Sequence, residues 1–172
     1  MTARHDHPNR HLYLIRHGLA EPRGPAWPDD ARRPLTERGM ARLAKEVRAL
    51  DALGVVLDAI LTSPLVRTRQ TAEIVASGFR QRPPVVSLDA LAPDGSAAAV
   101  VAALEAQAKR RRVALVGHEP GLGELAARLI GAGRAIGFKK GAICRIDVDA
   151  FPPLAPGELK WFVTPKMLKR IG

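Results

Sequence analysis

Short apolar runs alternate with helical patterns along most of this 172-residue chain, and this alternation restricts its fold more than any other feature. The apolar runs that fit buried strands are residues 11–15, 55–61 and 113–117, and the half-buried alternation of strands recurs at 143–148 and 159–163. The helical patterns cover residues 36–50, 64–77, 96–108 and 121–130. Strands and helices that alternate in this way form a mainly parallel sheet with helices on both faces. We therefore predict an α/β fold, a three-layer α/β/α sandwich.

The starts of two predicted helices carry capping signals. Thr36 can cap the first helix, and Ser63 followed by Pro64 predicts that the second helix begins at Pro64. The apolar residues of the first helix recur at helical spacing, which leaves Glu46 and its basic neighbours for the solvent face. The first helix is therefore expected to be a surface amphipathic helix.

The length and composition of the chain favour one domain. With 47% hydrophobic residues, the chain can bury one sizeable core but is short for two. We expect a single domain at 11–172 after a disordered tail at 1–10. The crowded histidines His5, His7 and His11 belong to a polar, proline-containing leader without a set of acidic or cysteine ligands around them and are not expected to bind a metal. No apolar stretch fits a signal peptide or a membrane span, which predicts a cytoplasmic protein with no membrane partner.

The charge balance predicts an anionic partner. Lys and Arg number 27 against 17 Asp and Glu, so the formal net charge is +10. Aromatic residues make up only 4% of the chain and leave few platforms on which bases could stack, so a nucleic acid is not the expected partner. The single cysteine, Cys144, excludes an internal disulfide and is consistent with a reducing compartment.

Two of the predicted strands end in a histidine. His17 follows the first strand within Arg16-His17-Gly18, and His118 follows the third. The carboxyl ends of parallel strands share one edge of the sheet, where ligands bind in this architecture. Arg67, near the start of a helix, would add guanidinium donors to the amide donors of that helix. These residue types together predict an anion-binding site.

Several longer motifs occur in order along the chain. They are Arg16-His17-Gly18, Pro34-Leu35-Thr36-Glu37-Arg38-Gly39, Ser63-Pro64-Leu65-Val66-Arg67 with Gln70-Thr71-Ala72, and Gly117-His118. This series resembles the histidine phosphatase superfamily, also called phosphoglycerate-mutase-like, branch 1. The resemblance implies a metal-independent phosphatase without a cofactor, in which His17 attacks phosphorus and becomes phosphohistidine. It further implies that Arg16, Arg67 and His118 surround the transferred group, and that Arg33 also binds phosphate.

These roles agree with the chemistry of phosphoryl transfer. The reaction requires positioning of the phosphoryl group and stabilisation of charge on its oxygens, and fixed cations supply both. For attack, one ring nitrogen of His17 must be unprotonated, which adjacent arginines favour because they disfavour a further positive charge. A backbone carbonyl could hold the proton of the other nitrogen.

The general acid that family members use on phosphate esters has no clear counterpart. It is expected within residues 88–95, but Ala92 is not acidic and Asp94 is the nearest substitute, which can equally cap the helix that begins near Ser96. The imidazole of phosphohistidine leaves more readily than an alkoxide and needs less help from an acid. The chain therefore resembles the SixA-type phosphohistidine phosphatases, which implies a phosphorylated protein partner such as a histidine-containing phosphotransfer domain.

Two alternatives remain open from the sequence. A phosphatase of a small phosphorylated metabolite, such as a sugar phosphate or a nucleotide, would use Asp94 as its acid. A non-catalytic phosphate- or nucleic-acid-binding module is supported only by the net charge. The sequence assigns neither an oligomeric state nor a role to Glu21 or Arg23.

Overall fold

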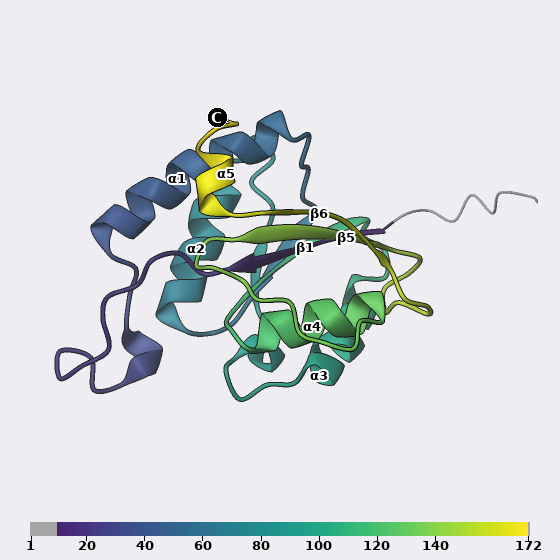
Figure 1. The fold of residues 1–172 in the computed structure, drawn as a ribbon, viewed down its shortest axis with the longest axis horizontal. Coiled ribbons are helices and arrows are strands. Elements are labelled where there is room, and N and C mark those ends of the chain that lie inside the picture. Colours follow the sequence, from purple (N-terminus) through teal and green to yellow (C-terminus); the bar gives the residue numbers. More distant parts are fainter. Residues whose placement is uncertain (1–9, 172) are drawn as a thin grey trace, which may run out of the picture.

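A single mixed sheet forms the centre of the computed structural model, which describes residues 10–171 (Figure 1). Its six strands within that range are β1 (Arg10–Arg16), β2 (Ala59–Thr62), β3 (Val85–Ser87), β4 (Arg112–Gly117), β5 (Ile143–Val148) and β6 (Glu158–Val163). Their order across the sheet is β3-β2-β4-β1-β5-β6. β3, β2, β4 and β1 are parallel to one another, whereas β5 runs antiparallel to both β1 and β6. The predicted mainly parallel sheet is confirmed.

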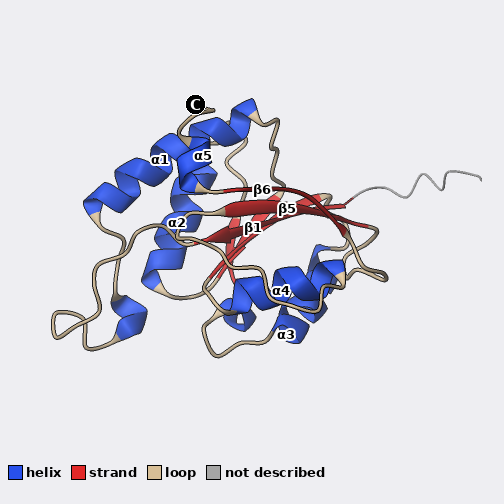
Figure 2. Ribbon diagram, in the orientation of Figure 1, coloured by secondary structure: helices blue, strands red, loops and turns tan. Residues whose placement is uncertain are grey.

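Helices cover both faces of this sheet (Figure 2). One face carries α1 (Glu37–Ala52), α2 (Val66–Ser77) and the short α5 (Pro165–Leu168), and the other carries α3 (Ala97–Ala103) and α4 (Gly121–Ile130). Three 3-10 turns complete the described part of the chain: η1 (Asp30–Arg32), η2 (Asp89–Leu91) and η3 (Leu104–Gln107). The three-layer α/β/α sandwich is therefore confirmed.

Alternate residues of the strands supply two hydrophobic cores. In β1, Tyr13 and Ile15 pack toward α1 and α2, whereas Leu12 and Leu14 pack toward α3 and α4. All four are at most 2% exposed. Burial of a leucine or isoleucine side chain stabilises a fold by about 1.5–3 kcal/mol, so both layers hold β1 in place. The residue that follows β1 is consequently held in a fixed position.

Cys144 of β5 lies in the second of these cores. It is fully buried, and burial raises the pKa of its thiol to about 12. The thiol is therefore protonated at neutral pH and packs as a small apolar side chain.

Several element boundaries differ from the predicted ones. Thr36 caps α1 as expected, accepting a hydrogen bond from the Gly39 N–H at 2.8 Å. α2, however, begins at Val66 rather than Pro64, and its N-cap Leu65 makes no side-chain hydrogen bond. The strand predicted at 55–61 begins only at Ala59, and β3 was not predicted because it is short and exposed. α3 ends at Ala103, and η3 continues the predicted helix as a tighter turn.

Glu46 of α1 does not face solvent as predicted. Only 3% of it is exposed, and its Oε1 accepts a hydrogen bond from the Arg42 Nε at 2.7 Å. A Cβ placed on Gly141 would lie 3.1 Å from the Glu46 Oε2, so the segment around Gly141 covers this side of the helix. Burial raises the pKa of Glu46 despite the hydrogen bond from Arg42. Helical periodicity cannot reveal this burial because the covering residues lie far along the chain.

The amino-terminal prediction is only partly within the described residues. β1 already begins at Arg10, and the other residues of the predicted tail, 1–9, lie outside the description. Across residues 10–171, every helix is too short or too polar to cross a membrane.

Candidate active site

The ends of β1 and β4 bring two histidines together. Arg16 at the end of β1 pairs with Gly117 at the end of β4, so that the next residue of each strand, His17 and His118, emerges at the same edge. Their ring centroids lie 5.2 Å apart. Both side chains are buried, at 5% and 6% exposure. The parallel pairing of two strands therefore creates a buried histidine pair from residues about a hundred positions apart.

The hydrogen bonding of His17 leaves one of its ring nitrogens free. Its Nδ1 lies 2.8 Å from the carbonyl oxygen of Gly18, and since a carbonyl only accepts, Nδ1 carries the proton and Nε2 carries the lone pair. Burial lowers the pKa of His17 to about 4; the bond to Gly18 opposes this shift, and the charges of Arg67 and Arg16 add to it. The imidazole is therefore neutral at pH 7.

The turn that follows His17 is tied to α2. The Gly18 N–H donates to the Thr71 hydroxyl at 3.1 Å, and this hydroxyl donates to the Arg67 carbonyl at 2.7 Å. Thr71 belongs to the predicted Gln70-Thr71-Ala72 motif and is fully buried. Gly18, whose carbonyl accepts the hydrogen bond from the His17 Nδ1, is thus linked through Thr71 to α2, the helix that carries Arg67.

His118 is held by a side chain rather than by backbone. Its Nε2 lies 2.8 Å from the hydroxyl oxygen of Ser63, which is fully buried. The predicted helix-capping role of Ser63 is wrong, because the N-cap of α2 is Leu65. The Ser63 hydroxyl accepts a hydrogen bond from the Leu65 N–H at 3.4 Å, before the helix begins, and contacts His118. Burial lowers the pKa of His118 to about 3, and the charges of His17 and Arg67 lower it further. Sequence pattern does not reveal this contact, which spans 55 positions.

Two arginines complete what we call the cleft cluster, namely Arg16, His17, Arg67 and His118. The Arg16 Nη1 donates to the Phe138 carbonyl at 2.5 Å, and Arg67 donates through Nη1 and Nη2 to Asp30. Their Nε atoms, like the His118 Nδ1, are buried without a hydrogen-bond partner among the described residues. Buried donors are nearly always paired in proteins, so unpaired donors around one cleft indicate a site for an anion.

The cleft that these residues line has a volume of about 600 Å³. Its lining includes the cleft cluster together with three further basic residues, Arg23, Arg33 and Lys140. Its acidic lining residues are Glu21 and Glu119. Burial lowers the pKa of Lys140, and the neighbouring charge of Arg16 lowers it further, which reflects the density of positive charge here. An anionic ligand suits this balance of charge.

Arg33 lies in the cleft wall and is itself fixed by hydrogen bonds. It is 6% exposed, its Nε donates to the Asp30 carboxylate at 2.8 Å, and its Nη1 donates to the Glu21 carbonyl at 2.7 Å. Glu21 thus contributes through its backbone, whereas the Arg23 side chain is 80% exposed and its Nε lies 3.5 Å from the Asp30 carboxylate. Sequence reasoning missed Asp30, because a proline-rich loop gives no local signal of its partners.

Asp94 does not reach the cleft. It is exposed, and the neighbouring Pro93 lines the cleft in its place. Nor does Asp94 cap α3, since the Ser96 hydroxyl accepts the capping hydrogen bond from the Ala99 N–H at 3.1 Å. The position of Asp94 gives no support to its predicted role as a general acid.

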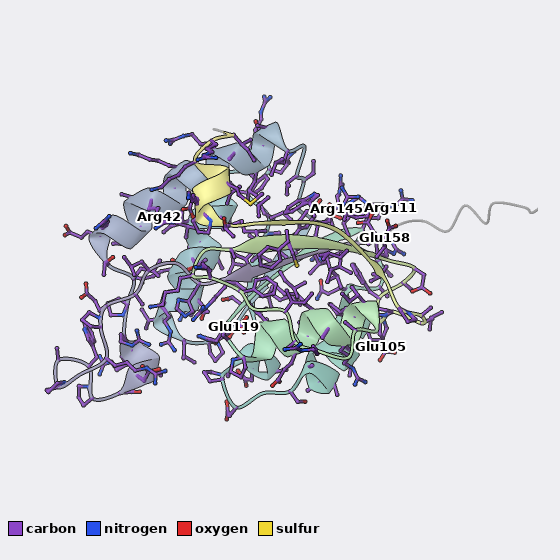
Figure 3. All side chains as sticks on the ribbon, viewed as in Figure 1. Arg42, Glu105, Arg111, Glu119, Arg145 and Glu158 are labelled. Carbon is purple, nitrogen blue, oxygen red and sulfur yellow. The ribbon has the colours of Figure 1, made fainter. Side chains whose placement is uncertain are left out.

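Glu119 is a cleft carboxylate that sequence reasoning did not select. It directly follows His118 and lies near the start of α4 (Figure 3). Its Oε1 accepts a hydrogen bond from the Phe138 N–H at 3.2 Å. Burial raises its pKa, against the opposing effects of that hydrogen bond and of Arg16. Its place beside a strand-end histidine was the available signal. No three His, Cys, Asp or Glu side chains in the described part of the chain are grouped as a metal site would require.

Comparison with known proteins defines the family. The profile of the histidine phosphatase superfamily (branch 1) matches residues 12–92. An uncharacterised protein of Picosynechococcus sp. is 41% identical over 136 residues, which are 77% of this chain and 81% of that protein. The protein histidine phosphatase SixA, solved with tungstate, is 26% identical over 91% of this chain and 97% of its own, with a TM-score of 0.80.

A further solved structure shares the fold. It is a protein from Agrobacterium tumefaciens assigned to the SixA phosphohistidine phosphatases, with a TM-score of 0.77 and 24% identity over 92% of this chain and 99% of its own. The family profile and the shared fold therefore define a phosphatase of the phosphoglycerate-mutase-like class. The chain belongs to the histidine phosphatase superfamily, branch 1, and within it is SixA-like.

Proposed function

We propose that this phosphatase hydrolyses phosphohistidine on a partner protein and that His17 is its nucleophile. The observation that carries the proposal is the convergence, in one basic cleft, of the neutral His17 imidazole with the unpaired buried Nε–H donors of Arg16 and Arg67 and the unpaired Nδ1 of His118. A nucleophile with a free lone pair, surrounded by donors for charged oxygens, fits phosphoryl transfer through a covalent intermediate.

The proposed reaction has two displacements. The His17 Nε2 lone pair attacks phosphorus, the bond from phosphorus to the substrate imidazole breaks, and the leaving nitrogen keeps the electron pair and takes a proton from solvent. Water then attacks the phosphohistidine at His17, releases phosphate and restores the neutral imidazole. Arg16 and Arg67 stabilise the charge on the phosphoryl oxygens in both steps. Arg33, which lines the cleft and donates to Asp30, adds positive charge to the site.

Two features support a protein phosphohistidine as the substrate. The segment where an acid was expected presents Pro93 to the cleft and leaves Asp94 outside it. The lining residues Leu19, Pro22 and Lys140 are exposed, so a side chain projecting from another protein has access. A leaving group that departs without strong acid assistance suits such a site.

The test is a comparison of substrates. Wild-type enzyme and H17A are incubated with a phosphorylated histidine-containing phosphotransfer domain and with a panel of sugar phosphates and nucleotides, and kcat/KM is measured for each. We expect wild-type kcat/KM on the phosphorylated domain to exceed that on every ester by at least about 100-fold, the size of a typical acid-catalysis contribution. Turnover of esters alone would refute the phosphohistidine proposal.

Glu119 favours a second candidate, hydrolysis of a small phosphate monoester. Its carboxyl lies in the cleft beside His118 and has a raised pKa, so it is the cleft residue best placed to protonate an ester leaving group. E119Q keeps an oxygen that can accept the Phe138 N–H. If esters are the substrate, E119Q slows their hydrolysis by about 100-fold, the size of a typical acid-catalysis contribution, while D94N leaves it unchanged.

A further inference from the structure

Asp30 of η1 pairs with three arginines: the exposed Arg23 at 3.5 Å, and two buried ones from different parts of the chain, Arg33 and Arg67. Its Oδ1 accepts from the Arg33 Nε at 2.8 Å, and its Oδ2 accepts from the Arg67 Nη2 at 2.9 Å. Its backbone carbonyl accepts from the Arg67 Nη1 at 2.8 Å. Arg33 and Arg67 are 6% and 2% exposed, so these hydrogen bonds connect buried guanidinium groups. One residue therefore holds both Nη atoms of Arg67.

The contacts with Asp30 determine which edge of Arg67 remains available. A guanidinium group is planar, with five N–H donors in a fixed arrangement. With Nη1 and Nη2 both directed at Asp30, the edge formed by Nε and the second N–H of Nη2 is left. That Nε is buried without a partner among the described residues, although Arg67 lines the cleft. Two parallel N–H groups along such an edge match two oxygens of a tetrahedral anion.

Asp30 stays ionised while it makes these contacts. Burial alone would raise its pKa, but the hydrogen bond from Arg33 and the charge of Arg67 hold the pKa below its usual value. A carboxylate near a phosphate site repels the anion, so its charge alone would weaken phosphate binding. If Asp30 promotes phosphate binding, it must therefore do so by orienting the arginines.

We propose that Asp30 is a positioning residue that orients Arg67 so that the Nε edge of its guanidinium faces the phosphoryl group. This inference rests on the proposed function, in which Arg67 binds that group. Asp30 itself does not contact the substrate. Arg33 completes the arrangement by holding the other oxygen of the Asp30 carboxylate.

Asp29 provides a matched control in the same loop. It carries the same charge and its side chain accepts a hydrogen bond from the Ala31 N–H at 3.0 Å, which caps η1. Within the described residues its carboxylate forms neither an ion pair nor a hydrogen bond with an arginine. Removal of Asp29 therefore tests charge and loop capping without disturbing Arg67.

The experiment measures tungstate affinity, kcat and KM for D30A, D30N, D29A and R67A. The double variant carrying both D30A and R67A is included, and a thermal melt of each variant checks the fold. Loss of two charge-assisted hydrogen bonds predicts that D30A binds tungstate about 10- to 30-fold more weakly than wild type. We expect D30N to be intermediate, since its amide oxygen keeps one acceptor, and D29A to stay within about twofold, because it leaves Arg67 in place.

The double variant distinguishes orientation of Arg67 from other roles. If Asp30 acts through Arg67, adding D30A to R67A lowers tungstate affinity by no more than about twofold. Unchanged or tighter binding in D30A, or the full loss again in the R67A background, would overturn the inference. Failure of the proposed function is seen separately, as phosphatase turnover that survives H17A, whereas tungstate affinity reports the arginines directly.

Discussion

The two histidines of the cleft cluster occupy equivalent places at the ends of β1 and β4 yet are fixed in different ways. The Nδ1 of His17 donates to the main-chain carbonyl of Gly18, and the Nε2 of His118 contacts the hydroxyl of Ser63 from the end of β2. A carbonyl can only accept, so it imposes one tautomer, whereas a hydroxyl can donate or accept. The site therefore contains one histidine of fixed protonation and one whose partner tolerates both forms.

This difference agrees with the proposed division of labour. A nucleophile must present a lone pair in every catalytic cycle, and the backbone hydrogen bond secures it for His17. A group that stabilises phosphoryl oxygens must present an N–H to them. When the Nε2 of His118 accepts from the Ser63 hydroxyl, its unpaired Nδ1 carries that N–H. The comparison makes separate predictions for each histidine and for the partner of each.

The largest effect is expected for H17A. It removes the proposed nucleophile, so kcat/KM falls by at least about 1,000-fold, the range seen when a nucleophile is deleted. Steady-state release of phosphate measures the loss, and acid-labile incorporation of labelled phosphate into wild type but not H17A tests the intermediate. If H17A kept more than about a tenth of the wild-type activity, His17 would not be the nucleophile.

A smaller loss is expected for H118A. The variant loses one donor to the phosphoryl oxygens and keeps His17 with its Gly18 partner, so kcat falls by about 100-fold. Labelled phosphoenzyme should still form, more slowly than in wild type, when measured by rapid quench. A phosphoenzyme that forms at the wild-type rate but breaks down slowly would instead place His118 in the second displacement only.

S63A is expected to have a weaker effect, because it keeps both histidines and removes only the hydroxyl that contacts His118 and accepts from the Leu65 N–H at 3.4 Å. We expect kcat to fall by about tenfold, the equivalent of one hydrogen bond. The nucleophilic attack by His17 should change little. S96A is the matched control, since its hydroxyl caps α3 and Ser96 does not line the cleft. Equal losses in S63A and S96A would mean that the Ser63 hydroxyl acts through stability alone, which thermal melts would reveal.

The smallest effect on activity is expected from pH. Because the pKa of His17 is lowered to about 4 and that of His118 to about 3, both stay neutral well below the usual histidine value of 6.5. We expect kcat/KM, which reports the free enzyme, to change less than about twofold from pH 7 to 5.5. A pH profile with an acid limb near 6.5 would contradict the buried neutral pair.

Fold stability should respond to pH more strongly than activity does. Below pH 6.5 the unfolded chain binds protons at both histidines that the folded protein does not bind, so stability falls as pH falls toward 4. The loss is about 1.4 kcal/mol per pH unit for each histidine. Urea unfolding of wild type and H118A at pH 7 and 5 isolates one histidine's share, with H118A losing less.

The fold and the histidine pair were accessible from sequence for a specific reason. Hydrophobic periodicity identifies the strands, and parallel pairing places whatever follows β1 beside whatever follows β4, which brings His17 and His118 together. Arg67 was accessible because it lies near the start of a helix after the neighbouring strand β2. Local sequence patterns therefore predicted the site residues whose positions are set by the pairing and order of the strands.

The partners of these residues were not accessible in the same way. Ser63 has the local pattern of a helix cap, yet its contact is with His118 on another strand end. Asp30 lies in a proline-rich loop and meets Arg67 only because that loop folds back over α2. Glu46 lies on the helix side that periodicity assigns to solvent, but the segment around Gly141 covers it in the fold. Each case depends on side-chain contacts between distant segments, which periodicity does not encode.

The burial of Cys144 has a consequence for the conditions under which the enzyme can work. Oxidants such as hydrogen peroxide attack thiolates, and the chain's single thiol is protonated, inaccessible and remote from any role in the proposed chemistry. Phosphatases whose nucleophile is a cysteine lose that thiolate to peroxide. If His17 is the nucleophile as proposed, catalysis needs no thiolate, and we expect activity to persist at peroxide concentrations that inactivate cysteine-based phosphatases.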